Sequence, residues 1–284
     1  MSRRLPHTNS YGYTMPRMKS FAGYSILRQM PPGGMTDLFL ALDSSRHRVV
    51  IRCLREPYAK DRKWRKSFYK TAQVMAKFNH PHILQIYDAG HVGRQPYMAM
   101  EYIESQNLRS LLLKKDVLLT RNALPILRQM AEALCYVQRM GYLHCDFKPD
   151  NVLLRDDGTA VLIDFDLVTR YRNAPVRLKE ARGTRFYMPP ETLAKKTVDE
   201  QTDVYAWGVT AYEVMTFHKP FEANTLEGAH AAQTDVTTLP RPMSTYQEGI
   251  PKALERLILK CLAKRKEDRY PSMGLVLNAL KALI

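Results

Sequence analysis

HCDFKPDNVLLRDDGTAVLIDFD, residues 144–166, contains two short apolar runs joined by the turn sequence DDG. Apolar runs of this length around such a turn predict an antiparallel β-hairpin, with the turn centred near Asp157. Asn151 lies six residues before that centre and Asp164 lies seven residues after it. Because the paired strands run in opposite directions, we expect these two side chains at the same end of the hairpin.

Other polar groups are expected at that end, because Asp146 and Lys148 come just before the first strand. With Asn151 and Asp164 they bring together two carboxylates, one amide and one ammonium. Carboxylate and amide oxygens are ligands for Mg²⁺, which proteins hold through few side chains together with phosphate oxygens. A polar hairpin end with ordinary surface charges is the alternative interpretation of this stretch.

The length and composition indicate a folded protein with a basic surface. A chain of 284 residues suits one large domain or two lobes. With 45% hydrophobic and 25% charged residues, it does not have the composition of a disordered protein. The formal net charge of +15 favours an acidic ligand, such as nucleic acid, anionic lipid, nucleotide phosphates or an acidic protein. A basic surface without a specific ligand is the other interpretation of this charge.

The cysteines and the apolar runs indicate in which cellular compartment the protein is expected. The four cysteines show no CxxC pair and no zinc-type spacing, which predicts free thiols in a reducing compartment and hence a cytoplasmic localisation. No apolar run is long enough to span a bilayer, and the start lacks the apolar region of a secretory signal, so no membrane segment is expected. Residues 1–20 contain no acid and are predicted to form a flexible basic arm.

Two regions of different periodicity follow the arm. Residues 21–103 contain several strand patterns and one helical pattern, which begins near Lys60 in a dense group of bases. Residues 104–284 are dominated by helical patterns, including DVYAWGVTAYEVM, which is apolar nearly all round, as in a central buried helix. We therefore expect an α+β fold, with a small antiparallel β-sheet lobe carrying one main helix and a larger, mainly helical lobe.

The order of five motifs resembles that of eukaryotic-type Ser/Thr protein kinases: HCDFKPDN, DFD, GTRFYMPPE, DVYAWG and CLAKRKEDRY. The stretches GGM, FNHPHILQIYDAG and YMAMEYIE look closest to bacterial members of that family. The resemblance covers nearly the whole chain after the arm and implies a bilobal protein kinase fold. It also implies ATP and Mg²⁺ as cofactors and a protein as substrate or partner.

The resemblance implies roles for the polar residues of the hairpin. Asp146 would be the catalytic base that accepts the proton of the substrate hydroxyl, and Lys148 would steady the transferring phosphoryl group. Asn151 and Asp164 would hold Mg²⁺. Thr184, in GTRFY, resembles the threonine that joins the base and the lysine.

The resemblance further implies a nucleotide site and a structural ion pair. Met100 would be the gatekeeper, and residues 101–103 would be the hinge that meets the adenine. Glu191 and Arg269 resemble the buried ion pair that stabilises the helical lobe in this family. The implied nucleotide-binding set comprises Gly33, Gly34, Leu38, Val50, Arg52, Met100, Glu101, Ile103 and Leu153.

The glycine-rich loop departs from the family pattern. Pro31 stands where the first glycine belongs and Thr36 where the third belongs. Proline has no N–H group and fixes its own φ, and Pro32 removes a second donor. Gly33 and Gly34 remain. The loop is therefore predicted to be stiffer than usual and a poorer cradle for phosphates.

The strand VVIRCL departs from the V-A-I-K pattern at two positions. Val50 replaces the alanine that roofs the adenine, and its extra methyl groups narrow that slot. Arg52 replaces the lysine that reaches the phosphates, and its forked guanidinium is not equivalent to an ammonium. The glutamate that usually pairs with this lysine is replaced by Thr71. Arg52 is expected to find another carboxylate such as Asp164, in competition with Mg²⁺, or to bind nucleotide, or to point to solvent.

The activation segment, residues 164–191, also differs from the pattern. Cys145 replaces the arginine that usually receives a phosphate, and Thr169 and Thr184 are the threonines that could accept one. Asp166 replaces the glycine of D-F-G and is either a further metal ligand or a brake on backbone flexing. The segment contains six basic residues, which favour an acidic or phosphorylated partner. A solvated loop without a partner is the other interpretation. The six are Arg170, Arg172, Arg177, Lys179, Arg182 and Arg185.

Two functions follow from these patterns. The first is a pseudokinase or very weak kinase that binds Mg-nucleotide and acts by docking a protein partner. The second is an active Ser/Thr kinase that transfers the γ-phosphate of ATP to a protein hydroxyl. Nucleic-acid binding by the arm and the basic residues 60–70 is a weaker alternative, because no recognised nucleic-acid module is present.

Overall fold

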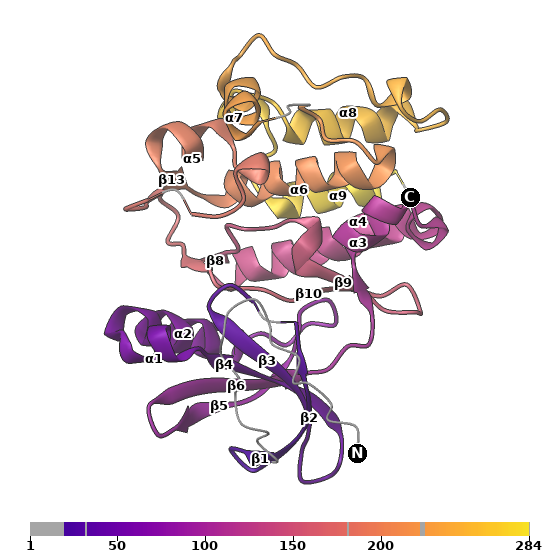
Figure 1. Ribbon diagram of the computed structural model, residues 1–284. Helices are drawn as coiled ribbons and strands as arrows, with labels where there is room; N and C mark the ends of the chain where they lie inside the picture. Colours follow the sequence, from indigo (N-terminus) through magenta and orange to yellow (C-terminus); the bar gives the residue numbers. More distant parts are fainter. Residues whose placement is uncertain (1–19, 32, 181, 222–224, 284) are drawn as a thin grey trace. The chain divides into compact units, whose positions relative to one another are not determined.

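The computed structural model describes residues 20–31, 33–180, 182–221 and 225–283 (Figure 1). Residues 1–19 of the predicted basic arm, and Pro32, lie outside the described residues. The chain divides into two compact units, of which unit 1 contains the residues up to Tyr69 and Ile86–Tyr102. Unit 2 contains Lys70–Gln85 and the residues from Ile103 onward.

Unit 1 is built on one antiparallel sheet of six strands in the order β1-β2-β3-β4-β6-β5 (Figure 1). Aromatic, small and β-branched side chains at alternating positions form the buried core on one face of this sheet, as the strand patterns predict. The strands are β1 (Ser20–Phe21), β2 (Tyr24–Met30), β3 (Thr36–Leu42), β4 (Arg48–Leu54), β5 (Ile86–Val92) and β6 (Gln95–Glu101). Two helices follow β4, namely α1 (Glu56–Lys60) and α2 (Arg62–Met75), the second of which ends in unit 2.

Unit 2 is mainly helical, with short strand pairs between the helices (Figure 1). Its remaining helices are α3 (Leu108–Lys114), α4 (Val117–Arg139), α5 (Pro190–Lys195), α6 (Glu200–Thr216), α7 (Leu226–Thr234), α8 (Lys252–Cys261) and α9 (Met273–Lys281). Its strands are β7 (Gln106–Asn107), β8 (Tyr142–Leu143), β9 (Val152–Leu154), β10 (Ala160–Leu162), β11 (Thr169–Arg170), β12 (Val176–Arg177) and β13 (Thr197–Val198). Single turns of 3₁₀ helix occur at η1 (Pro149–Asn151), η2 (Arg185–Tyr187), η3 (Met243–Thr245) and η4 (Lys266–Asp268).

The helix α6 is the centre of unit 2, as its apolar sequence predicts. It packs against α4, α8 and α9, and Trp207 is fully buried with its Nε1–H donating to the Leu127 carbonyl at 3.2 Å. A Cβ atom on Gly208 would lie 2.7 Å from Cys261 Cβ, so glycine allows the close approach of α6 and α8. Asp199 begins the helix, because its side chain accepts from the Gln201 amide.

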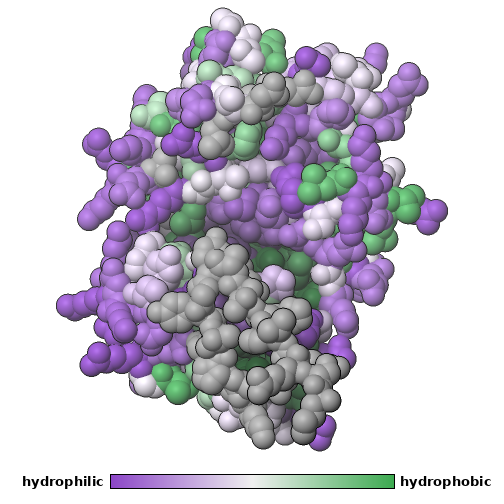
Figure 2. Space-filling view, in the orientation of Figure 1, coloured by the Kyte–Doolittle hydropathy of each residue, from purple (hydrophilic) through white to green (hydrophobic). Residues whose placement is uncertain are grey.

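The expected fold class is confirmed. The small antiparallel sheet and the larger helical unit match the bilobal kinase fold that the motifs imply. In the described ranges, no helix has both the length and the apolar content needed to cross a membrane. Hydrophilic residues cover most of the visible surface of the helical unit in Figure 2, with hydrophobic residues in small groups.

The implied ion pair between Glu191 and Arg269 is present. The two guanidinium nitrogens of Arg269 lie 2.7 and 3.0 Å from the two carboxylate oxygens of Glu191. Arg269 is buried, and it also donates to the main-chain carbonyls of Ala263 and Lys264. The pair therefore joins the start of α5 to the turn before α9, so that the end of the activation segment has a fixed anchor.

We expect Glu191→Gln to destabilise unit 2 by about 3 kcal/mol, because it leaves the buried Arg269 guanidinium without a counter-charge. Glu248→Gln, at an exposed glutamate, is the matched control and should change stability little. Thermal unfolding of the three proteins measures the difference. Equal melting temperatures for Glu191→Gln and the wild type would contradict the structural role of this pair.

Candidate active site

The hairpin forms in the register predicted from its turn. Val152 pairs with Leu162 and Leu154 pairs with Ala160, which centres the turn on Asp157. The Ile163 amide then donates to the Asn151 carbonyl at 3.0 Å, so pairing continues to the residue before Asp164. The predicted juxtaposition of Asn151 and Asp164 at one end of the hairpin is confirmed.

The loop before the hairpin is fixed by a buried carboxylate on α6. Asp203 accepts from the main-chain N–H groups of His144 and Cys145, both at 2.9 Å. Cys145 has a φ of 66°, a left-handed conformation that a non-glycine residue adopts only when its surroundings require it. The His144 Nδ1 atom accepts from the Asp146 amide at 3.2 Å, which continues this anchoring to the predicted base.

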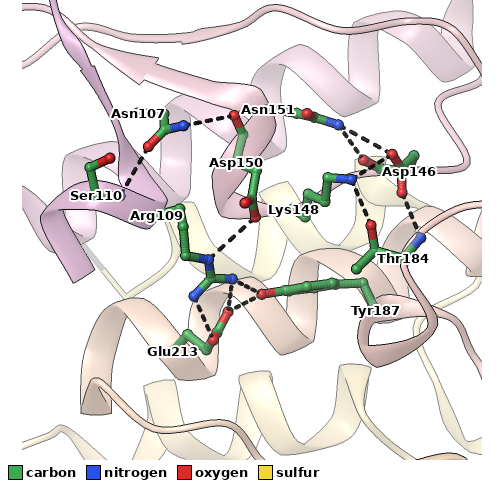
Figure 3. Close-up of polar contacts among 10 residues, drawn as sticks. All are labelled: Asn107, Arg109, Ser110, Asp146, Lys148, Asp150, Asn151, Thr184, Tyr187 and Glu213. Carbon is green, nitrogen blue, oxygen red and sulfur yellow. Dashed lines mark hydrogen bonds and ion pairs between the residues drawn. The ribbon is translucent and has the colours of Figure 1, made fainter. Parts of the chain in front are cut away.

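Asp146 is held from both sides by the predicted partners (Figure 3). Its Oδ1 accepts from the Thr184 amide at 2.9 Å, and its Oδ2 lies 2.9 Å from Lys148 Nζ. Lys148 Nζ also lies 2.6 Å from Thr184 Oγ1, so the threonine joins the base and the lysine. Gly183 has a φ of 122°, and a Cβ atom there would lie 3.1 Å from Asp146 Oδ1, so a glycine is needed for this approach.

The oxygen atoms at this end of the hairpin are suitable ligands for Mg²⁺. Asn151 Nδ2 donates to the Asp146 carbonyl at 2.9 Å, so Oδ1 is the atom of this amide that suits a metal. Asp164 Oδ1 accepts from the Asp166 amide at 3.0 Å, which fixes the carboxylate next to the end of β10. Within the described ranges, no group of three or more His, Cys, Asp or Glu side chains is able to hold a metal. Two oxygen ligands from the chain match a cation that completes its shell with phosphate oxygens and water.

In unit 1 the glycine-rich loop is closed on itself. The Gly33 amide donates to the Thr36 carbonyl at 3.0 Å, so this N–H is used inside the loop. The Gly33 carbonyl accepts from Arg55 Nη2 at 2.8 Å, and Arg55 Nε pairs with Asp37 at 3.0 Å. Pro31 has no N–H to offer. Gly33 and Pro31 therefore offer no free N–H group to a ligand, whereas the stiffness of the loop stays a prediction.

Arg52 is held beside that loop by Thr36. Arg52 Nε donates to Thr36 Oγ1 at 3.2 Å. Leu38 pairs with Arg52 and Thr36 pairs with Leu54, so Thr36 and Arg52 are diagonal neighbours on one face of the sheet. Sequence reasoning treated Thr36 only as an obstruction, because the bond to Arg52 depends on the register between β3 and β4, which no local pattern shows. Thr71, which replaces the glutamate that usually pairs with the lysine of the V-A-I-K pattern, is buried and carries no charge.

The predicted nucleotide-binding residues are divided between the two units. Leu38, Val50, Arg52 and Met100 share one face of the sheet, because Val50 pairs directly with Met100 and lies next to Leu40. This face is opposite the one that carries the core cluster of unit 1. Seven of the nine predicted residues belong to unit 1, whereas Ile103 and Leu153 belong to unit 2. Their roles in binding stay predictions.

The activation segment is held by main-chain pairing that the sequence did not reveal. Thr169 of β11 pairs with Leu143 of β8, and Val176 of β12 pairs with Val198 of β13. Lys70 Nζ also donates to the Val168 carbonyl at 2.9 Å. These anchors are made by the chain itself, and the absence of control by phosphorylation, inferred from Cys145, stays a prediction.

Burial changes the proton affinity of the groups that fix the loop. It raises the pKa of Asp203 to about 6, against the opposing effect of the hydrogen bonds from Cys145 and His144. Burial also lowers the pKa of His144 to about 4, so the imidazole is neutral at pH 7. A neutral ring is consistent with Nδ1 accepting from the Asp146 amide.

Comparison with known proteins agrees with this geometry. The family model described as protein kinase domain matches residues 24–279. The chain therefore belongs to the protein kinase family, and its relatives are bacterial Ser/Thr kinases of the eukaryotic type.

Three relatives illustrate the similarity. Serine/threonine-protein kinase PknE of Mycobacterium tuberculosis is 32% identical over 258 residues, which cover 89% of this chain and 45% of PknE. Serine/threonine-protein kinase PknL of Mycobacterium tuberculosis is 30% identical over 262 residues, covering 90% of this chain and 65% of PknL. Probable serine/threonine-protein kinase PknB of Bifidobacterium longum is 28% identical over 270 residues, covering 90% of this chain and 39% of that protein. The chain thus spans less than half the length of PknE and of this PknB.

The raised pKa of Asp203 makes the stability depend on pH in a defined direction. Between pH 4 and 6 the folded protein binds this proton and the unfolded chain has begun to release it, so stability falls as the pH rises. Asp203→Asn lacks this ionisation. We expect the stability of the wild type relative to this variant to fall by about 3 kcal/mol from pH 4 to pH 7.

Urea unfolding of both proteins at several pH values measures this difference. Asp156→Asn, at an exposed carboxyl in the hairpin turn, is the control and should give a much flatter difference curve. A flat curve for Asp203→Asn as well would show that the Asp203 carboxyl titrates normally.

Proposed function

We propose that this chain is a slow Ser/Thr protein kinase domain that binds Mg-ATP weakly and phosphorylates a hydroxyl of a protein. The observation that carries the proposal is the arrangement around Asp146. Its carboxylate is oriented by the Thr184 amide and by Lys148, and its main chain is held by Asn151. An acceptor oriented in this way, beside a fixed ammonium, suits transfer of a phosphoryl group to a hydroxyl.

Each residue has a defined task in this proposal. The Asp146 carboxylate orients the substrate hydroxyl and accepts its proton as the new O–P bond forms and the bond from the γ-phosphorus to the bridging oxygen breaks, with ADP as the leaving group. The Lys148 ammonium stabilises negative charge on the transferring group, and Thr184 keeps it beside Asp146. Asn151 and Asp164 would hold Mg²⁺, which when bound neutralises charge on the phosphates.

The low rate follows from the contacts in unit 1. Phosphates need free N–H donors from the loop, but the Gly33 amide is used by the Thr36 carbonyl and Pro31 has none. The Arg52 guanidinium is engaged by Thr36, and the usual glutamate is replaced by Thr71. Because every 1.4 kcal/mol of lost transition-state stabilisation lowers the rate about tenfold, these changes together predict a weak enzyme.

The same contacts favour a second candidate function. A chain whose phosphate loop is closed and whose activation segment is anchored without phosphate is suited to work as a docking module. In that case any bound nucleotide would stabilise the fold, and the function of the chain would be to bind a protein partner.

Phosphate transfer from labelled ATP separates the two candidates. We expect slow transfer to a protein substrate in the presence of Mg²⁺ or Mn²⁺, and a loss of about 100-fold or more in Asp146→Asn, because the general base is removed without a change of shape. Asp156→Asn is the control. Transfer that survives in Asp146→Asn would contradict the proposed role of this carboxylate. No transfer, combined with a thermal shift by Mg-ATP, would support the docking module.

A second pair of variants tests why the enzyme is slow. Thr36→Gly removes the hydroxyl that holds Arg52 and the side chain that crowds the loop, so we expect transfer to rise about tenfold. Thr36→Ser keeps the hydroxyl and should stay near the wild-type rate. Steady-state rates with the same protein substrate measure the effect. Equal rates in Thr36→Gly and Thr36→Ser would show that this bond does not limit the reaction.

A further inference from the structure

A network of one cation and two acids lies beside the loop of Asp146 (Figure 3). Arg109, on α3, donates through Nη1 and Nη2 to the two carboxylate oxygens of Glu213 at 3.1 and 3.3 Å. Its Nε atom donates to Asp150 at 3.3 Å. The Tyr187 hydroxyl donates to Glu213 and accepts from Arg109. One guanidinium therefore binds two carboxylates that come from different elements, which leaves a second negative charge to be balanced.

The network adjoins the residues that hold the predicted base. Asp150 lies between Lys148 and Asn151 in the sequence, and Tyr187 is three residues after Thr184. The network also runs from the interior to the surface, because 5% of the Glu213 side chain is exposed but 44% of the Asp150 side chain. A peptide whose hydroxyl reaches Asp146 would therefore pass close to Asp150.

A second cation adds to the neutralisation. Lys219 interacts electrostatically with Glu213 and Asp150, and its ammonium lies 3.9 Å from the centre of the Phe186 ring. Burial lowers the pKa of Lys219, and the two carboxylates oppose this shift. The charges of the two acids are thus offset by two cations, Arg109 and Lys219.

The neighbouring activation segment is strongly basic. Residues 167–190 contain six bases and one acid, Glu180, which lies 3.4 Å from Arg182. The six bases are exposed, and Arg182 and Arg185 flank the two residues that contact Asp146. Because β11 and β12 are paired with neighbouring strands, these charges are displayed on a backbone that is held in place.

We propose that the segment of protein that docks beside Asp146 is anionic, and that Arg109 determines this preference. By occupying Glu213 and Asp150, Arg109 removes the acids that would otherwise bind a basic side chain of the partner. The exposed arginines of the activation segment then favour carboxylate or phosphate groups. This inference rests on the proposed function for the place where the segment docks, but binding itself does not require phosphate transfer.

The consequence of removing Arg109 is specific. Arg109→Met leaves Glu213 largely buried without its guanidinium, and a buried unpaired carboxylate strongly favours a cation. An arginine on a peptide can supply that cation. A residue that only stabilised the fold would not alter the choice between acidic and basic peptides, so the choice is the informative measurement.

Fluorescence anisotropy without ATP tests the proposal, so that an inactive enzyme does not hide the result. Labelled peptides of equal length carry one serine flanked by glutamates, by phosphoserines, by glutamines or by arginines. For the wild type we expect glutamate or phosphoserine peptides to bind at least tenfold more tightly than the arginine peptide, with a difference that shrinks as salt is added. The two anionic peptides distinguish a carboxylate from a phosphate ligand. Equal binding of the acidic and basic peptides would overturn the proposal.

Variants then test the role of Arg109. In Arg109→Met we expect the preference for acidic over basic peptides to fall at least tenfold, whereas Arg109→Lys should retain most of it. Arg128→Met, at an exposed arginine of α4, is the control and should leave the preference unchanged. An unchanged preference in a folded Arg109→Met protein would overturn the assignment.

Two further measurements test the docking site without relying on Arg109→Met. If Arg109→Met does not fold, the surface variant Arg182→Glu with Arg185→Glu should still weaken binding of the acidic peptides at least tenfold, and unchanged binding would overturn the docking site. A labelled single-stranded oligonucleotide is the competing ligand. Binding of this oligonucleotide as tight as that of the acidic peptide would indicate a general polyanion surface and would overturn the assignment to a protein segment.

Discussion

The carboxylate of Asp203 is the constraint on which the rest of the site depends. It is fully buried, yet it accepts from two consecutive main-chain N–H groups, those of His144 and Cys145. Two backbone donors in a row can meet one carboxylate only if the chain turns sharply, which accounts for the positive φ of Cys145. The turn directs the next residue, Asp146, toward the activation segment. A buried carboxylate on α6 thus fixes the direction of the loop that carries Asp146.

The same helix also controls the surface beside the base. Asp203 lies near the start of α6, and Glu213 lies near its end. The first of these acids accepts from the catalytic loop, and the second accepts from Arg109 and Tyr187. Because α6 is surrounded by other helices, neither carboxylate can move away from its partners without disturbing the core of unit 2. The loop that carries Asp146 and the charged groups beside it are therefore both held by the same helix.

Local patterns predicted the parts of this site that lie close together in the sequence. The hairpin around Asp157 and the approach of Asn151 to Asp164 follow from turn chemistry and strand direction alone. The Arg109–Glu213 contact joins residues 104 positions apart, so no local pattern contains it. The two residues meet because of the packing of unit 2. The periodicity of 3.6 residues predicts each helix but not which helices lie next to each other. The sequence shows that Thr36 places a side chain where the family has a glycine. Its bond to Arg52 could be inferred only once the register of β3 and β4 was known.

The two units differ in how they use their hydrogen-bond donors. In unit 2 the Thr184 amide, the Lys148 ammonium and the Asn151 amide all orient Asp146, so internal bonds prepare the residue that would react. In unit 1 the Gly33 amide bonds to the loop itself and Arg52 Nε donates to Thr36, so these two N–H groups already have partners. A donor that already has a partner must give it up before it can bind a phosphate, and the free energy of that exchange is subtracted from nucleotide affinity. Under the proposed function, this preorganisation would favour catalysis in unit 2 and oppose phosphate binding in unit 1, so that Asp146 would be ready to react while the nucleotide would be weakly held.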